Sequence, residues 1–170
     1  MKVAVKDSGL LIDLDLMGVL DLWFLLETET ITTDQIFREV RFRHPNVVAH
    51  VDSGSLKIHQ IGLSRVLNEL DRAGYEKLSP EDVSILILAR DKRAMLLTCD
   101  GSLRKEAKGQ AIEVHGSIWV MDRLVKANLL SGEVAAFKLE TLMNLSGAEK
   151  RFIPIKEAET FIDKWLKDDG

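Results

Sequence analysis

The chain has 170 residues, of which 46% are hydrophobic and 29% are charged. These proportions are ordinary for one globular domain, and they exclude a disordered or fibrous chain. The formal net charge of −4 excludes a protein that coats nucleic acid through overall positive charge, so any nucleic-acid chemistry would need a local basic patch. The only cysteine, Cys99, allows no internal disulfide, so nothing indicates an oxidising compartment.

The sequence shows no pattern typical of a membrane span or a signal peptide. Its most apolar stretch, residues 16–26, is short and interrupted by Asp21, whereas a spanning helix needs roughly 20 apolar residues. The N-terminal apolar run is also short and meets charged residues at once. We therefore expect a cytoplasmic protein without a membrane partner.

The start of the chain predicts one strand followed by three helices. Residues 3–5 form a short apolar run before Asp-Ser-Gly, which is typical of a buried strand that ends in a sharp turn. Leucines recur at helical spacing over residues 10–24, and Gly18 divides this stretch into two helices. From residue 31 to residue 40, apolar residues lie three and four apart after two threonines, which predicts a helix with a threonine cap.

Residues 41–79 have a less regular pattern, and we expect them to form a variable insert. His44-Pro45 ends the preceding helix. The runs 47–51 and 56–61 are β-branched or alternating, and Asp-Ser-Gly-Ser lies between them. This combination predicts a small hairpin.

Two helices follow the predicted hairpin. The first is amphipathic, begins at Leu63 and ends at Gly74. The second opens with Ser79 as its cap, proline at its first position and Asp82 at its third. The apolar run after Asp82 implies that this helix is buried on most sides.

Strands and helices then alternate along the chain: a strand at 94–98, a helix at 103–108, a strand at 111–114 and a helix at 116–130. Such alternation predicts an α/β sandwich on a mainly parallel sheet. We expect residues 1–130 to form the main domain, and residues 131–170 to form a helical extension packed on the same domain. The last helix, at about 155–167, carries Phe161 and Trp165 on one side, which we expect to pack on the core or to form a homodimer seam.

Four acidic residues are candidates for one site. Asp7 and Asp100 each follow a short apolar strand, and in an open parallel sheet ligands bind beyond the carboxyl ends of the strands. Asp82 lies in the first turn of a buried helix and can face the same edge, and Glu39 lies two turns into the threonine-capped helix. Four carboxylates in one cleft repel one another and need a neutralising cation. A set of oxygen ligands suits Mg²⁺ or Mn²⁺ better than zinc.

Each acid also has a purely structural explanation. Asp7 and Asp100 are suited to turns or helix caps, because their carboxylates can accept hydrogen bonds from nearby backbone amides. Asp82 can complete a capping box with Ser79, and Glu39 can lie on a solvated helix face. Only their joint pattern favours a metal site.

Five segments carry a family resemblance: VKDSGLLIDL around Asp7, ITTDQIFREV ending near Glu39, LSPEDVSILILA around Asp82, LLTCDGSLRKEA around Asp100, and IEVHGSIWVMDRLVKANLL after it. Their order and spacing resemble a PIN domain, the fold of many metal-dependent ribonucleases, including VapC-like toxins of bacterial and archaeal toxin–antitoxin pairs. The match spans residues 3 to about 130. It implies a three-layer α/β/α fold with a C-terminal helical extension.

The resemblance implies that Asp7, Glu39, Asp82 and Asp100 hold one or two divalent cations and hydrolyse RNA phosphodiester bonds. Thr98 and Ser8 match supporting hydroxyl positions of the family. An antitoxin protein is then an expected partner. The chain departs from the family at Gly101, where many relatives carry a further acid, and in the segment between Arg41 and Ser79.

A substrate with a phosphate backbone needs basic contacts near these acids. Residues 90–108 carry six basic and three acidic residues. We expect Arg104 and Lys105 in this stretch, with Arg38 beside Glu39, to contact the RNA backbone. A solvated helix face is the alternative explanation for such residues.

Other patterns are less favourable. The DLDLMG motif at 13–18 is similar to the start of haloacid-dehalogenase-like phosphatases, but it is expected inside a helix, where Asp13 and Asp15 diverge. A receiver domain needs an adjacent acid pair after its first strand, and the four histidines lack the spacing of a zinc site. The main alternative to a nuclease is a PIN-like module that binds nucleic acid or protein with little catalysis.

Overall fold

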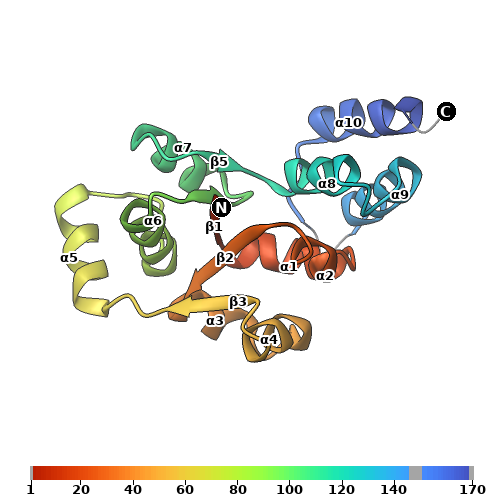
Figure 1. Ribbon diagram of the computed structural model, residues 1–170. Coiled ribbons are helices and arrows are strands. Elements are labelled where there is room, and N and C mark those ends of the chain that lie inside the picture. Colours follow the sequence, from red (N-terminus) through yellow and green to blue (C-terminus); the bar gives the residue numbers. More distant parts are fainter. Residues whose placement is uncertain (1, 146–150, 169–170) are drawn as a thin grey trace.

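A computed structural model of the chain describes residues 2–145 and 151–168. Its centre is a five-stranded sheet in the order β3-β2-β1-β4-β5, in which every neighbouring pair is parallel (Figure 1). The strands are β1 (Lys2–Lys6), β2 (Thr28–Thr33), β3 (Leu56–His59), β4 (Met95–Leu97) and β5 (Val114–His115). The strand order changes direction beside β1, and in such sheets ligands bind at the carboxyl ends next to this switch point.

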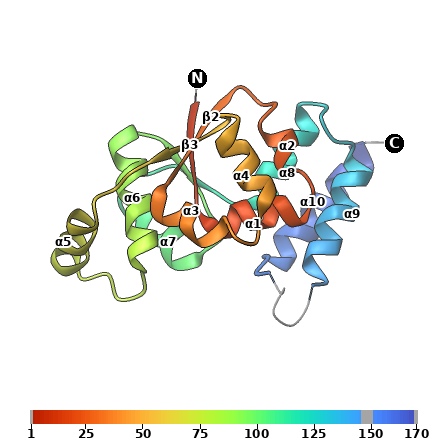
Figure 2. The ribbon, with the colours of Figure 1, turned by 90° about the horizontal axis from the view of Figure 1, so that it is seen from below.

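Helices cover both faces of the sheet, which confirms the three-layer α/β/α architecture. On one face, α6 (Pro80–Lys92) packs on β1, β2 and β4, with α5 (Leu63–Ala73) and α7 (Gly101–Gly109) against it. On the other face lie α1 (Ser8–Leu16), α2 (Leu20–Trp23), α4 (Pro45–Asp52) and α8 (Ser117–Lys126) (Figures 1 and 2). The short α3 (Asp34–Val40) follows β2 and contacts both α1 and α6.

The C-terminal helices pack on this second helical layer. They are α9 (Gly132–Met143) and α10 (Ile155–Asp168), which contact each other and α8 (Figure 2). Trp165 of α10 is 1% exposed, and its indole N–H donates to Oδ1 of Asp122 at 3.1 Å. The aromatic face of the last helix therefore packs on the protein's own core, as the first of the two expectations had it.

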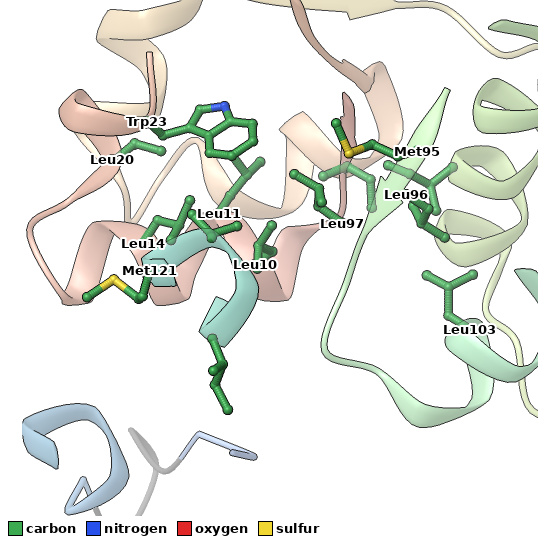
Figure 3. Packing of buried hydrophobic residues seen from close by; sticks show 14 of the residues in the cluster. Leu10, Leu11, Leu14, Leu20, Trp23, Met95, Leu96, Leu97, Leu103 and Met121 are labelled. Carbon is green, nitrogen blue, oxygen red and sulfur yellow. The ribbon is translucent and has the colours of Figure 1, made fainter. Parts of the chain in front are cut away.

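The core lies on both faces of the sheet, and Figure 3 shows the part of it around α1, α8 and β4. Leu10, Leu11 and Leu14 of α1 are fully buried, and they pack among Trp23 of α2 and Met121 of α8. This packing explains why α1 is apolar around most of its circumference. It also fixes the position of the first residue before α1, which is Asp7.

The capped helices follow the sequence prediction closely. Ser79 and Asp82 form a complete capping box at the start of α6, and seven consecutive residues of α6, from Val83 to Ala89, are buried. Gly74 ends α5 in the left-handed conformation at φ +63°. Gly18, also left-handed, lies between α1 and α2.

The predicted hairpin in the variable insert is wrong. The first run is the helix α4, with Pro45 at its start, and the second run is β3, which pairs with β2 in parallel. The reason is that Val47 is buried against the core on one helix face, while β3 extends the sheet beyond β2. His50 and His59 therefore do not share a hairpin surface, since His50 lies in α4 and His59 in β3.

The strand β2 was not predicted. The helix expected over residues 31–40 begins only at Asp34, because residues 31–33 belong to β2 and Thr33 is the cap of α3. The strand predicted at 111–114 is shorter and later than expected, because Ala111 lies in a turn at φ +57° before β5 begins at Val114.

Candidate active site

Asp7 lies at the centre of the carboxyl edge of the sheet. Its backbone N–H donates to the carbonyl of Leu97 at 3.2 Å, which joins the end of β1 to the end of β4. Its carboxylate caps α1 by accepting from the N–H of Leu10 at 2.7 Å. The residue is only 5% exposed.

Thr98 links two of the predicted acids. Its hydroxyl donates to Oδ2 of Asp7 and accepts a hydrogen bond of 3.0 Å from the backbone N–H of Asp100. Thr98 is fully buried. A threonine directly after β4 therefore holds the loop of Asp100 beside the carboxylate of Asp7.

Asp100 and Asp82 each begin a helix at this edge. Oδ1 of Asp100 caps α7 by accepting from the N–H of Leu103 at 2.7 Å, and the residue is exposed. Asp82 is half-buried, and its Oδ2 accepts from the backbone N–H of Ser79 at 2.9 Å. Asp82 and Asp100 therefore both have the helix-capping roles expected from the sequence. These roles do not prevent the two acids from lying at the same edge of the sheet.

Glu39 approaches the edge from α3. Although the residue is exposed, its carboxylate is a hydrogen-bond partner of the Ser8 side chain, at the start of α1. Ser8 directly follows Asp7, so the two hydroxyls of Ser8 and Thr98 each serve one of the acids. Both contacts are compatible with the supporting role that the resemblance implies for Ser8 and Thr98, which stays a prediction.

Burial and like charge raise the pKa of three of these carboxyl groups. Burial raises the pKa of Asp7 to about 7, against the opposing effect of its hydrogen bonds from Thr98 and Leu10, and the charges of Asp13 and Asp82 add to the rise. Burial is also the main reason that the pKa values of Glu39 and Asp82 are raised. The charge of Asp82 contributes to the rise for Glu39, and the charge of Asp100 contributes to the rise for Asp82.

These mutual effects place the four carboxylates in one electrostatic group. Among the lysines and arginines whose side chains the structure describes, in residues 7–145 and 151–168, none forms an ion pair with Asp7, Glu39, Asp82 or Asp100. Negative charge is therefore concentrated here without an ion-pair partner among those side chains. Such a group is stabilised by a bound cation or by protonation.

The chemistry of this donor set fits a hard divalent cation, because all its ligating atoms are carboxylate oxygens. The distances between the carboxylates fit a metal site less well than their chemistry does. In the described part of the chain, no group of three or more His, Cys, Asp or Glu side chains lies close enough together to hold a metal ion. Three of the four carboxylates each accept a hydrogen bond from a backbone N–H at a helix N-terminus.

A second buried acid beside the site was not predicted. Asp13 is 1% exposed, and its Oδ1 accepts from Nε of Arg151 at 2.5 Å. Burial raises the pKa of Asp13. Asp15 diverges from it as expected and instead hydrogen-bonds His44 and Asn46, so the phosphatase-like motif forms no site. No sequence signal connects Asp13 with a residue as distant as Arg151.

The predicted backbone-contacting residues differ in their surroundings. Arg38 is 68% exposed and pairs with Asp34 at 2.6 Å, one helical turn away. Arg104 is half-buried, and its Nη1 donates to the carbonyl of Thr98 at 3.0 Å. Lys105 is exposed and lines a cavity of about 410 Å³ together with Gly101, next to Asp100.

In the part of the chain that the structure describes, neither Cys99 nor a histidine belongs to a cluster of three or more side chains that could hold a metal ion. Burial raises the pKa of the Cys99 thiol to about 11, so it is a poor nucleophile at neutral pH. His44 and His50 hydrogen-bond Asp15 and Asp21, and His115 stacks on Trp119.

Comparison with known families identifies the fold. Residues 3–165 match the DUF3368 family, which is described as a PIN domain. The chain belongs to the PIN domain family. PIN domains are generally nucleases and typically use divalent metals. No curated protein matched the sequence.

Three solved structures are similar to this chain at low sequence identity. PAE2754 from Pyrobaculum aerophilum has a TM-score of 0.52 and 19% identity, over 74% of this chain and 90% of its own. A domain of a protein of unknown function from Methanocaldococcus jannaschii has a TM-score of 0.47 and 17% identity, over 68% and 91% of the two chains. The PilT N-terminus domain protein SSO1118 from Sulfolobus solfataricus has a TM-score of 0.40 and 12% identity, over 69% and 89%.

Among the helices that the structure describes, none combines the length and the apolar character needed to cross a bilayer.

Proposed function

We propose that this PIN domain is a metal-dependent endoribonuclease that hydrolyses RNA phosphodiester bonds. The observation that supports the proposal is the coupled acidic group at the carboxyl edge of the sheet, with which no lysine or arginine in residues 7–145 and 151–168 forms an ion pair. Asp7 is buried without an ion-pair partner among the described side chains, and burying a charged carboxylate in this way is unfavourable unless a ligand or a proton compensates. A divalent cation is the ligand whose chemistry fits these carboxylates.

The proposed roles follow from the contacts of each residue. Asp7, Glu39, Asp82 and Asp100 would hold Mg²⁺ or Mn²⁺, and the bound ion would activate water and offset charge on the phosphate. Thr98 orients the Asp7 carboxylate and the Asp100 loop through its hydroxyl. Ser8 orients the Glu39 carboxylate through a side-chain hydrogen bond.

Basic residues around the edge would bind the RNA backbone. Lys105 is exposed beside Asp100 and is free to reach a phosphate. Arg104 already donates a hydrogen bond to the Thr98 carbonyl, and Arg38 already forms an ion pair with Asp34. Backbone contacts of this kind position a strand without reading its sequence.

The test is cleavage of single-stranded RNA by purified protein with Mg²⁺ or Mn²⁺, and then with EDTA. We expect EDTA and Asp7→Asn each to abolish cleavage. The matched control is Asp71→Asn, because Asp71 is an exposed acid on α5 outside the acidic group. Cleavage that survives both EDTA and Asp7→Asn would indicate a contaminating nuclease and would overturn the proposal.

We further propose the cellular role of a toxin whose partner is an antitoxin protein. The support is the membership of the PIN family, whose members often bind RNA and include proteins that pair with antitoxins. Induced expression of the wild type should arrest growth, and Asp7→Asn should not. Co-expression of a small reading frame adjacent to the gene should relieve the arrest.

A PIN-like binding module with little catalysis is the second candidate. Two observations favour it: the carboxylates are not gathered within reach of a common ion in the described chain, and Gly101 stands where many relatives carry a further acid. Such a module would bind RNA or protein with no cleavage that depends on metal. Stabilisation of the fold by Mg²⁺ or Mn²⁺, measured by thermal unfolding, would favour the nuclease over the module.

A further inference from the structure

A cavity of about 270 Å³ lies beside the acidic edge, at the carboxyl ends of β4 and β5. Its walls come from three places that are distant in sequence: the loop after β4, the start of α8, and the segment that leads into α10. The residues that matter for its chemistry are Gly101, Arg104, Gly116, Trp119, Phe152 and Glu157. Gly101 directly follows Asp100, so the cavity and the proposed metal site share one loop.

Two aromatic rings line this cavity. Trp119 is half-buried, and the ring of His115 stacks on it at 4.1 Å with an angle of 11° between the planes. The guanidinium of Arg123 lies 5.6 Å from the centre of the Trp119 ring. Phe152 is 88% exposed, which is the highest value among the large apolar residues described as exposed. The Trp119 ring is thus held in place by its neighbours, whereas the Phe152 ring is open to solvent.

Arg104 lies between the cavity and the acids. Its Nη1 donates to the carbonyl of Thr98, the residue whose hydroxyl binds Asp7. Glycine at position 116 makes this placement possible, since a Cβ there would lie 3.2 Å from Nη1 of Arg104. The guanidinium therefore has a fixed place at the boundary between the two sites.

Glu157 gives the cavity a polar character that disfavours phosphate. Glu157 lines the cavity that Arg104 also lines, so the cavity has one acidic and one basic residue and little net charge. A carboxylate repels a phosphate but accepts a hydrogen bond from an exocyclic amine of a base. Aromatic rings and guanidinium planes are the groups on which proteins stack unpaired bases of single-stranded RNA.

We propose that this cavity is a nucleobase subsite, which takes one unstacked base of a single-stranded RNA whose phosphate lies at the acidic edge. The base stacks on Phe152 and Trp119, and Arg104 lies between the base and the neighbouring phosphate. The inference rests on the proposed ribonuclease function for the identity of the substrate. It assigns to the segment before α10 a part in substrate selection.

The test measures binding of a fluorescein-labelled single-stranded RNA by the full-length Asp7→Asn protein, which leaves the strand intact. The comparison probe is the same strand with abasic nucleotides, which keeps the phosphates and removes the bases. Phe152→Ala in this background should weaken binding of the base-bearing strand by at least about fivefold. It should leave binding of the abasic strand unchanged.

Phe152 suits this experiment because its exposed side chain contributes little to folding. Phe137→Ala is the matched control, since Phe137 is 69% exposed on α9 and does not line this cavity. Trp119→Leu is the second variant, and it should act in the same direction as Phe152→Ala. Thermal unfolding establishes that each variant is folded.

Two results would overturn the subsite. One is equal binding of the base-bearing and abasic strands by the parent protein. The other is that Phe152→Ala leaves RNA binding unchanged, or weakens binding of both strands equally. This second result is also expected if the cavity binds an apolar peptide and not a base. Neither result bears on the nuclease proposal, which the EDTA experiment on the wild type tests independently. The two proposals can therefore fail separately.

Discussion

Arg151 and Asp13 form an ion pair across 138 positions of sequence, with Nε of Arg151 donating to Oδ1 of Asp13 at 2.5 Å. The same guanidinium donates from Nη2 to the carbonyl of Gly9 at 2.9 Å. Gly9 lies in the first turn of α1, which Asp7 caps. The segment before α10 is therefore fastened to the turn that carries the central acid of the site.

We expect Arg151→Ala to destabilise the protein by roughly 3 kcal/mol, because it leaves the Asp13 carboxylate buried without a partner. Urea unfolding at neutral pH measures the change as a lower midpoint with an unchanged slope. The double variant Asp13→Asn with Arg151→Ala should recover much of the loss, since the uncompensated charge is then gone. Additive losses in the double variant would contradict this account of the pair.

Asp7→Asn should raise the stability of the fold at pH 8 while it removes the metal response. The pKa of Asp7 is raised from 3.8 to about 7 in the folded protein, so the folded state binds a proton more tightly than the unfolded state does. The stability that protonation provides is present below pH 3.8 and is lost as the pH rises to 7. One pKa unit corresponds to about 1.4 kcal/mol, so ionised Asp7 costs a few kcal/mol at pH 8.

Unfolding in urea at pH 5 and at pH 8, without and with Mg²⁺, measures this effect. Asparagine stays neutral and can still accept from the N–H of Leu10, so its advantage over the wild type should grow with pH. Mg²⁺ should stabilise the wild type and not the variant. A variant that is less stable than the wild type at pH 8 would show that the Asp7 charge is compensated within the chain.

The two functions assigned to Asp82 can be separated by a pair of variants. Ser79→Ala removes only the cap, because it deletes the hydroxyl that accepts from the Asp82 N–H at 3.1 Å. It should lower stability by about 1 kcal/mol and leave stabilisation by Mg²⁺ unchanged. Asp82→Asn keeps an oxygen for the Ser79 N–H, so it should affect stability little and reduce stabilisation by Mg²⁺.

Thermal unfolding over a series of Mg²⁺ concentrations distinguishes these outcomes. Loss of the Mg²⁺ response in Ser79→Ala and its retention in Asp82→Asn would reverse the assignment. Asp82 would then be a structural capping residue alone.

Local signals in the sequence predicted the parts of the fold that local chemistry determines. The capping box of Ser79 and Asp82 and the left-handed end of α5 at Gly74 depend on residues a few positions apart, so spacing is sufficient to find them. The placement of Asp7 and Asp100 followed from strands whose carboxyl ends share an edge. Thr98 was found through the family resemblance, and the structure gives it a physical role.

Features that depend on distant partners could not be predicted. The sequence TETITT is a strand because β1 and β3 flank it in the sheet, and its alternation alone is too polar to indicate a buried strand. The hairpin was wrong because Val47 and its neighbours fit both a strand and one face of a helix, and packing against the core decides between them. The pair of Asp13 and Arg151 has no local signal at all.

The final prediction concerns how RNA reaches an acidic site on an acidic protein. Lys105 is exposed on α7 beside the loop of Asp100, and within the described chain it has no ion-pair partner. A lysine that contacts a phosphate releases a counterion, so losing one contact should reduce the slope of log affinity against log salt by about 0.7 for single-stranded RNA. Lys105→Glu should therefore weaken RNA binding and flatten its salt dependence.

Lys167→Glu is the control, because it makes the same change of charge at an exposed position near the end of α10. Both variants alter the net charge equally, so a difference between their salt slopes reports contact rather than overall charge. Binding is measured across a salt series with labelled single-stranded RNA in the Asp7→Asn background. If the two variants gave the same slope, the backbone contact would belong elsewhere, and Arg104 at the boundary of the proposed base subsite would be the next residue to test.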